Sequence, residues 1–295
     1  MAMTTKSILI YVIRGSQFSA KVLAALDSRK IEHFCYFVSL DESKRKQELP
    51  SGGILVPEMK ITTVTKTGED GEREETVTSV KDSEKILHWF DDNMDTKFFP
   101  NQETSDLSVR VSDHTLAAFV YYYNWINDAG FERSMRSVAV RAIGVPSWVP
   151  FGPTLVGYLL SSQRKKFVDR ATTALKGASS IDNFDPSYLD DESKMYNLLM
   201  EELKYVQSFL QNDADKQPYL IAGCNEPTAA DVSVYVQMER LVGDSGDAKV
   251  PCALPNLMED EKDTLQRLWT WYSHMREKHP IQFMGKRIPT GQAKL

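Results

Sequence analysis

The sequence predicts two domains: an α/β domain with the element order βαβ then ββα, followed by an all-α helical bundle. Two observations support this. The apolar residues change from strand-like runs to helical spacing near residue 94, and a chain of 295 residues is longer than most single cores support. We place the α/β domain at 1–93, a polar linker at 94–105 and the helical domain at 106–295.

The chain begins with a strand, a tight turn and a helix. Residues 7–13 read SILIYVI, an apolar run typical of a strand that is buried on both faces. After Gly15 the apolar residues recur at helical spacing, and Ser16 or Ser19 is suited to cap this helix. Residues 33–39 form the next predicted strand, so the first three elements are a βαβ unit with parallel strands.

The second half of the α/β domain reads as two strands and a helix. A charged segment at 41–49 leads to a predicted strand at 54–61. This strand lies at a sheet edge or begins at Pro57, because proline cannot donate to a strand ladder. Residues 62–79 are typical of a hairpin of β-branched strands, and residues 82–83 are suited to cap the helix that follows.

From residue 106 onward the pattern is helical throughout. Predicted helical segments lie at 114–126, 153–175, 194–210, 229–242 and 263–278. Between Arg141 and Arg164 there is no charged residue, but prolines and glycines interrupt this stretch. We therefore expect a buried loop and a core helix there, and peripheral contact of 142–163 with a membrane stays an open alternative.

Composition excludes several classes of function. The net charge is −6 with both signs interspersed, so we expect no nucleic-acid partner. The three cysteines are far apart and form no metal-ligand spacing with the five histidines, so we expect reduced thiols and no metal. No secretory or transit signal opens the sequence, which predicts a cytoplasmic protein.

Four local features, in this order, resemble the glutathione transferase superfamily. Ser16-Gln17-Phe18-Ser19 stands where thioredoxin-like relatives place C-P-F-C. Val56-Pro57 matches the family's cis-proline, and Asp82-Ser83 resembles its acidic-Ser pair. Pro218 to Gly223, followed by Pro227 to Asp231, is similar to the signature that opens a buried helix of the second domain. The resemblance implies a thioredoxin-like first domain and a glutathione transferase-like chain as a whole.

The resemblance also implies a set of site residues. Glutathione is the expected cofactor, and Ser16 is the expected catalytic residue, whose hydroxyl stabilises the thiolate. The peptide would be held by Ser19, Val56, Pro57, Asp82 and Ser83. Tyr122 and Trp125 are expected to line a pocket for a small apolar electrophile.

One departure from the family pattern directs the choice of catalytic residue. In tyrosine-type classes the first strand ends Y-x-x-x-R-G, but here Tyr11 is one position too close to Arg14, which puts Ile10 at the expected tyrosine. This favours Ser16 over a tyrosine mechanism. Near the second-domain signature, Thr228 and Asp231 fit a capping box, which predicts a folding role for them.

Other functions stay open at this stage. The stretch at 156–166 resembles the membrane-associated prostaglandin E synthase type 2 and metaxin-like branch, in which case Ser16 and Ser19 replace both motif cysteines. The alternatives are a non-catalytic binding or membrane-recruited interaction protein, and a prostaglandin-synthase-like isomerase. A homodimer is a further open possibility.

Overall fold

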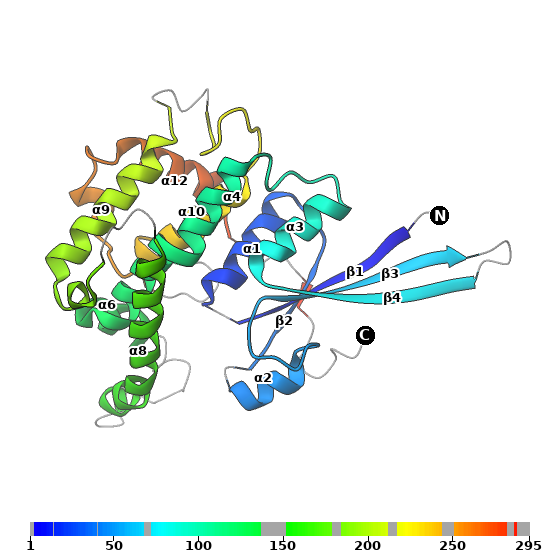
Figure 1. The fold of residues 1–295 in the computed structure, drawn as a ribbon, viewed down its shortest axis with the longest axis horizontal. Coiled ribbons are helices and arrows are strands. Elements are labelled where there is room, and N and C mark those ends of the chain that lie inside the picture. The colour runs from blue at the N-terminus through cyan, green and yellow to red at the C-terminus, as the bar shows by residue number, and fades with distance from the viewer. Residues whose placement is uncertain are drawn as a thin grey trace. The chain divides into compact units, whose positions relative to one another are not determined.

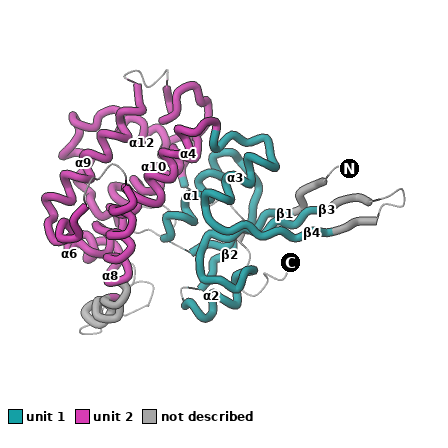
Figure 2. Tube along the Cα trace, in the orientation of Figure 1, with its two compact units in different colours: residues 1–99, 281–295 teal, residues 100–280 magenta. Residues whose placement is uncertain are grey.

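The computed structural model describes residues 3–13, 15–39, 41–67, 72–136, 152–178, 184–211, 217–243, 251–281 and 286–287. Two compact units make up the chain, residues 1–99 with 281–295 and residues 100–280 (Figure 2). The predicted linker at 94–105 spans the division between them. The C-terminal residues differ from the expected ranges, because they join the first unit, where the short strand β5 (Lys286–Arg287) pairs with β2.

The first unit contains one five-stranded sheet in the order β4-β3-β1-β2-β5 (Figure 1). Its first four strands are β1 (Met3–Val12), β2 (Phe34–Phe37), β3 (Glu58–Thr67) and β4 (Glu72–Lys81). β1 is parallel to β2 and antiparallel to β3, and β4 is antiparallel to β3. The helices α1 (Gln17–Ser28) and α3 (Ser83–Asn93) follow β1 and β4. The predicted order βαβ then ββα, and with it the predicted fold class, is confirmed.

The third strand settles the two alternatives left by Pro57. β3 lies inside the sheet between β1 and β4, and it begins at Glu58, directly after the proline. The missing N–H of Pro57 therefore costs no ladder hydrogen bond. The hairpin between β3 and β4 is confirmed, and its connection at 68–71 lies outside the described residues, as does Arg14.

The charged segment after β2 forms a short helix that the sequence analysis did not predict. This helix is α2 (Glu42–Glu48), and the side chain of its N-cap Asp41 accepts a hydrogen bond from Lys44 N at 2.8 Å. Leu49 ends the segment and packs with Leu9 and Tyr11 on one face of the sheet. The packing of Leu49 thus fixes the position of α2, whose own residues are mostly charged. The helix was not predicted because it has no stripe of apolar residues at helical spacing.

The described elements of the second unit are all helical, as predicted. They are α4 (Gln102–Val109), η1 (Arg110–His114), α5 (Thr115–Tyr121), η2 (Tyr122–Ile126), α6 (Asp128–Phe131), η3 (Glu132–Arg136), α8 (Gly152–Gly177), η4 (Pro186–Asp190), α9 (Glu192–Ser208), α10 (Ala229–Leu241), α11 (Leu257–Asp260) and α12 (Gln266–Lys278). The buried residues of α10 extend all around the helix, so α10 is the central helix of this unit.

Among the described residues, no helix is both long and apolar enough to span a membrane. Residues 137–151, where the uncharged stretch begins, lie outside the described part of the chain. At its other end, Arg164 donates hydrogen bonds to the carbonyl oxygens of Trp125 and Ile126 at 2.8 and 2.7 Å and pairs with Asp128 at 2.6 Å. Arg164 therefore supplies hydrogen-bond donors to carbonyl groups at the end of η2, which is a structural role.

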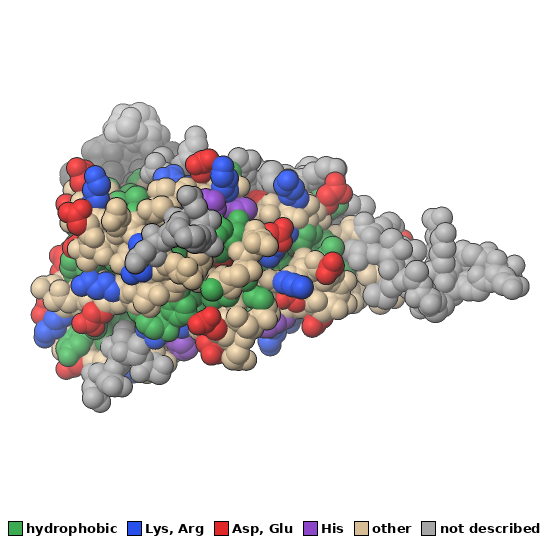
Figure 3. Space-filling model, turned by 90° about the horizontal axis from the view of Figure 1, so that it is seen from above, with side chains coloured by type: hydrophobic (Ala, Val, Ile, Leu, Met, Phe, Trp, Pro, Cys, Tyr) green, Lys and Arg blue, Asp and Glu red, His purple; other side chains and the backbone are tan. Residues whose placement is uncertain are grey.

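Charged side chains of both signs are mixed on the face shown in Figure 3. Lysines and arginines alternate there with aspartates and glutamates, and the described part of this face carries no patch of a single sign. This face therefore lacks the basic stripe that a polyanion would need.

Candidate functional site

Three segments of the first unit meet where β1 and β4 end and β3 begins, at the edge of the sheet that is formed by these strand ends. Tyr11, near the end of β1, pairs with Glu58 at the start of β3, and Glu58 pairs in turn with Lys81 at the end of β4. Since both pairings are antiparallel, the helix starts after β1 and β4 lie at the same edge as the loop before β3. A hydrogen bond from Asp82 N to Pro57 O at 3.3 Å joins two of these segments directly.

The start of α1 presents unused donors. Gly15 turns the chain with a φ of +76°, and Ser16 is the N-cap, whose Oγ accepts from Ser19 N at 3.3 Å. Ser16 is half-buried, and its hydroxyl hydrogen has no acceptor within the described residues. The backbone N–H groups of Gln17 and Phe18 have no intrahelical partner, because they belong to the first turn. A hydroxyl and two N–H groups at the positive end of a helix form an anion site.

Ser19 has a different place from Ser16. Its side chain is only 1% exposed, and its Oγ accepts a hydrogen bond from Ile13 N at 3.4 Å. This bond ties the first turn of α1 to the end of the strand segment before it. Contact between Ser19 and a ligand stays a prediction, and its burial favours a positioning role.

The loop before β3 carries free backbone groups. The Val56–Pro57 bond is cis, which is what the resemblance implied. Val56 is half-buried against the apolar cluster that contains Tyr11, and its own N–H and C=O make no hydrogen bond with the described residues. An extended peptide could pair with Val56 as one strand pairs with another.

The start of α3 leaves one carboxylate oxygen available. Asp82 is exposed, with a φ of +80°, and its Oδ1 accepts from Glu84 N at 2.9 Å and from Lys85 N at 3.4 Å. Its Oδ2 accepts no hydrogen bond from the described part of the chain. The N–H of Ser83, the first residue of α3, is likewise outside the intrahelical pattern. Asp82 and Ser83 together offer one acceptor and one donor to a ligand that carries both charges.

Two side chains near these helix starts were missed by the sequence analysis. Lys21 on α1 is buried and forms an ion pair with Glu84 in the first turn of α3, which holds the two helices together. The signal was a lysine beside Val22 on the apolar face of a predicted helix. Gln17, the residue after Ser16, is buried, and its Nε2 has no acceptor among the described residues.

Tyr11 lies near the end of β1, beside this set of donors. Its ring is buried against Tyr36, with the ring centroids 5.5 Å apart. Burial, followed by the nearby carboxylate of Glu58 and by Tyr36, raises the pKa of the Tyr11 hydroxyl. The phenol of Tyr11 is therefore neutral near pH 7, and the choice of Ser16 rests on the spacing of Tyr11 in the sequence.

The residues predicted to line the electrophile pocket lie in the second unit. Tyr122 is buried, and burial is the main cause that raises the pKa of its hydroxyl. Trp125 is half-buried and stacks on Phe167 with the ring centroids 4.1 Å apart. Both therefore belong to packed aromatic groups, and their role in a pocket stays a prediction.

The predicted capping box at the start of α10 is present. Thr228 Oγ1 accepts from Asp231 N at 3.4 Å, and Asp231 Oδ2 accepts from Thr228 N at 2.9 Å and from Thr228 Oγ1 at 2.7 Å. The other oxygen, Asp231 Oδ1, accepts from Leu220 N at 2.8 Å and from Trp271 Nε1 at 3.1 Å. With both oxygens occupied and the residue fully buried, this pair holds the fold.

Comparison with known proteins gives similarities of fold only. No family model matches the chain, and no curated protein matches it. A glutathione S-transferase of Methylobacillus flagellatus solved with glutathione bound is 14% identical with a TM-score of 0.44, over 95% of this chain and 100% of that one. Glutaredoxin 2 of Salmonella typhimurium in complex with glutathione is 13% identical with a TM-score of 0.41, over 94% and 97%.

A β-etherase of a Sphingobium species is similar at the same level, with 14% identity and a TM-score of 0.44 over 94% of this chain and 97% of that one. These identities lie below 25% and these TM-scores below 0.5. The similarities therefore assign neither a family nor an activity to this chain.

Proposed function

We propose that this chain binds glutathione at the sheet edge of its first unit and transfers it to a small apolar electrophile. The observation that carries the proposal is the start of α1, where the Ser16 hydroxyl hydrogen has no acceptor within the described residues. A donor held there has a use when an anion, such as a thiolate, lies beside it.

The chemistry of the tripeptide matches the groups along this edge. A thiolate would accept from Ser16, while the cysteinyl backbone would pair with the N–H and C=O of Val56. The γ-glutamyl ammonium would donate to Asp82 Oδ2, and its carboxylate would accept from Ser83 N–H.

In the proposed reaction Ser16 acts on the equilibrium between thiol and thiolate. The thiol proton leaves to solvent, the thiolate attacks the electrophile, and a carbon–sulfur bond forms as the leaving group departs or the acceptor carbon takes up a proton. A single charge-assisted hydrogen bond contributes about 1.5 to 3 kcal/mol, which is about one to two pKa units of the thiol. From an ordinary thiol pKa of about 8.5, such a shift raises the ionised fraction near pH 7 from a few per cent to between about a quarter and three quarters.

The second unit would supply the electrophile pocket. Tyr122 and Trp125 are the aromatic residues proposed to line it, since both belong to the aromatic groups of η2. A homodimer, peripheral membrane contact and a cytoplasmic location remain predictions from the sequence.

The replaced cysteines favour one alternative. Ser16 and Ser19 stand where relatives use thiols, so neither position can form a disulfide or act as a cysteine nucleophile. A chain that binds glutathione without turnover, as an interaction protein, is the second candidate. A prostaglandin-synthase-like isomerase that depends on these thiols is not favoured.

Ser16→Ala separates the two candidates. Conjugation of glutathione to 1-chloro-2,4-dinitrobenzene should fall about tenfold or more, while the dissociation constant of glutathione changes little, because the hydroxyl acts on the thiolate alone. The matched control is Ser28→Ala at the other end of α1, where the hydroxyl bonds Ala25 O. Wild-type chain that binds glutathione but shows no conjugation would favour the non-catalytic candidate, and no binding at all would overturn the proposal.

A further inference from the structure

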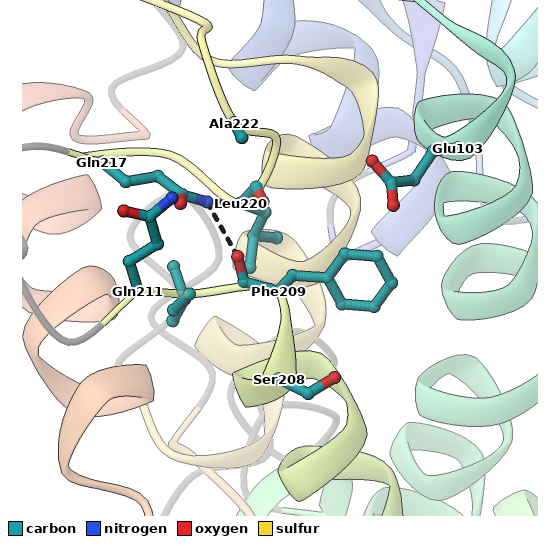
Figure 4. A pocket seen from close by; sticks show the side chains of 8 residues that line it. Glu103, Ser208, Phe209, Gln211, Gln217, Leu220 and Ala222 are labelled. Carbon is teal, nitrogen blue, oxygen red and sulfur yellow. Dashed lines mark hydrogen bonds between the residues drawn. The ribbon is translucent and has the colours of Figure 1, made fainter.

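A cavity of about 440 Å³ lies within the second unit, apart from the residues of the proposed glutathione site (Figure 4). Its walls come from the first turn of α4, the end of α9 and the segment 217–222. The side chains that matter for its chemistry are those of Glu103, Ser208, Phe209, Gln211, Gln217 and Leu220. A volume of this size is in the range of small-molecule sites.

Gln217 has a fixed orientation that leaves an acceptor unused. Its Nε2 donates to the carbonyl oxygens of Phe209 at 2.8 Å and Leu220 at 3.0 Å, so both amide hydrogens are occupied. A flipped amide would set Oε1 against two carbonyl oxygens, which excludes the other orientation. The residue is only 6% exposed, and Oε1 has no donor among the described residues. An unpaired buried acceptor indicates a missing donor.

The end of α9 carries the negative end of the helix dipole. Its carbonyl groups are largely occupied, since Val206 O accepts from Phe209 N at 3.2 Å and Gln207 O accepts from Leu210 N at 3.0 Å. Ser208 uses its hydroxyl hydrogen on Tyr205 O at 2.6 Å, so the lone pairs of Ser208 Oγ can only accept. This wall of the cavity therefore favours a ligand with N–H donors and positive charge.

The opposite wall carries the formal charge of the cavity. Glu103 is exposed, and its carboxylate has no hydrogen-bond or ion-pair partner within the described residues. In Figure 4 the Glu103 side chain points from α4 toward the cavity, while Gln211 and Gln217 extend from the other side, with Leu220 and the ring of Phe209 between them. Acceptors at two separated ends with an apolar surface between them match a chain of methylenes that carries ammonium groups.

One positive charge opposes such a ligand. Arg267 Nη1 donates to the carbonyl oxygen of Leu210, a residue of the cavity wall, at 2.6 Å. This contact occupies the Leu210 carbonyl group, and the guanidinium makes the electrostatic potential at this wall more positive, which disfavours a bound cation. A ligand with several ammonium groups at separate positions can still pair with Glu103 while it keeps its other charge away from Arg267.

We propose that this cavity binds a linear aliphatic polyamine, with one ammonium on Glu103 and another at the Gln217 end. The probe is spermidine, titrated calorimetrically into the full chain at about 50 mM salt, where charge screening is weak. We expect saturable binding of one molecule per chain. Octane-1,8-diol and suberate are ligands of similar length without charge and with negative charge, and neither should bind.

Glu103→Gln keeps the size of the side chain and removes its charge, so spermidine should bind about fivefold more weakly to this variant. Glu201→Gln removes an exposed glutamate elsewhere on α9 and should leave the affinity within about twofold. Circular dichroism of both variants establishes that they fold. The proposal is overturned by the absence of saturable binding, by equal losses in the two variants, or by preferred binding of suberate.

Discussion

An aspartate near the start of each of the helices α3 and α10 accepts hydrogen bonds from backbone N–H groups, but the two carboxylates differ in how many of their oxygens are occupied. Asp231 is buried, and each of its oxygens accepts two hydrogen bonds from the protein. Asp82 is exposed, and only its Oδ1 accepts hydrogen bonds, both from the first turn of α3. Both oxygens of Asp231 are therefore occupied by hydrogen bonds within the protein, whereas Oδ2 of Asp82 can accept a hydrogen bond from a ligand.

This difference assigns a structural role to Asp231 and a proposed ligand-binding role to Asp82, although the two sequence patterns are similar. Each aspartate follows or precedes a hydroxyl residue at a helix start, Ser83 in one case and Thr228 in the other. The number of donors on each oxygen, rather than the type of residue, decides the role. Substitutions at the two places should therefore affect different quantities, unfolding free energy at α10 and ligand affinity at α3.

The largest effect is expected for Asp231→Ala. The change leaves the donors of Leu220, Thr228 and Trp271 buried without an acceptor, which should lower the free energy of unfolding by about 3 to 5 kcal/mol. Denaturant unfolding measures this loss. Asp82→Ala is the matched change at α3 and should cost about 1 kcal/mol, the usual value of an N-cap. Equal losses in the two variants would remove the distinction between them.

Lys21→Met should come next, because it removes the buried cation that pairs with the partly buried Glu84. We expect a loss of about 3 kcal/mol in the free energy of unfolding. The double variant Lys21→Met, Glu84→Gln removes the carboxylate of this pair as well and should recover part of the loss. A single variant as stable as the wild type would show that the ion pair does not hold the two helix starts together.

Thr228→Ala should lower the free energy of unfolding by about 2 kcal/mol, the upper end for a cap, because this helix start is buried. Thr228→Ser keeps the hydroxyl and is the control. The glutathione affinity of the folded protein should not change, since the proposed ligand contacts lie in the first unit. Lost affinity with an unchanged melting temperature would place this loop in the binding site.

Local patterns predicted much of this molecule. Three predicted features depend on residues close together in the sequence, and each is present in the structure: the strand at 7–13, a helix cap at Ser16 or Ser19, and the box of Thr228 and Asp231. The cap is Ser16. Pro57 limited the strand predicted at 54–61 to a sheet edge or to a start at the proline, and β3 begins directly after it, at Glu58.

The features that were missed depend on distant residues. The Lys21–Glu84 pair joins positions 63 residues apart in the sequence. The return of the chain at β5 depends on pairing with β2, and only two residues take part. The helix α2 has no apolar stripe. The burial of Gln17 and Ser19 was also hidden, because a cap motif does not tell which side chain of the first turn faces inward.

A smaller effect is expected for Asp82→Asn. Asparagine still caps α3, so the free energy of unfolding should stay within about 0.5 kcal/mol of wild type. Glutathione should bind about fivefold more weakly, or about 1 kcal/mol, a modest value because the carboxylate is exposed to solvent. Asp41→Asn, at the exposed N-cap of α2, is the control and should leave the affinity unchanged. Calorimetric titration that finds the same dissociation constant in both variants would make Asp82 a cap only.

The most direct test is a titration of the isotope-labelled chain with reduced glutathione, followed through the backbone amide resonances. The proposed site predicts saturable shifts at Gln17, Phe18, Val56 and Ser83, whose N–H groups have no partner within the described residues. The amide of Asp231, which already donates within its capping box, should not move. Shifts confined to the second unit, or no saturable shift at the sheet edge, would contradict the account.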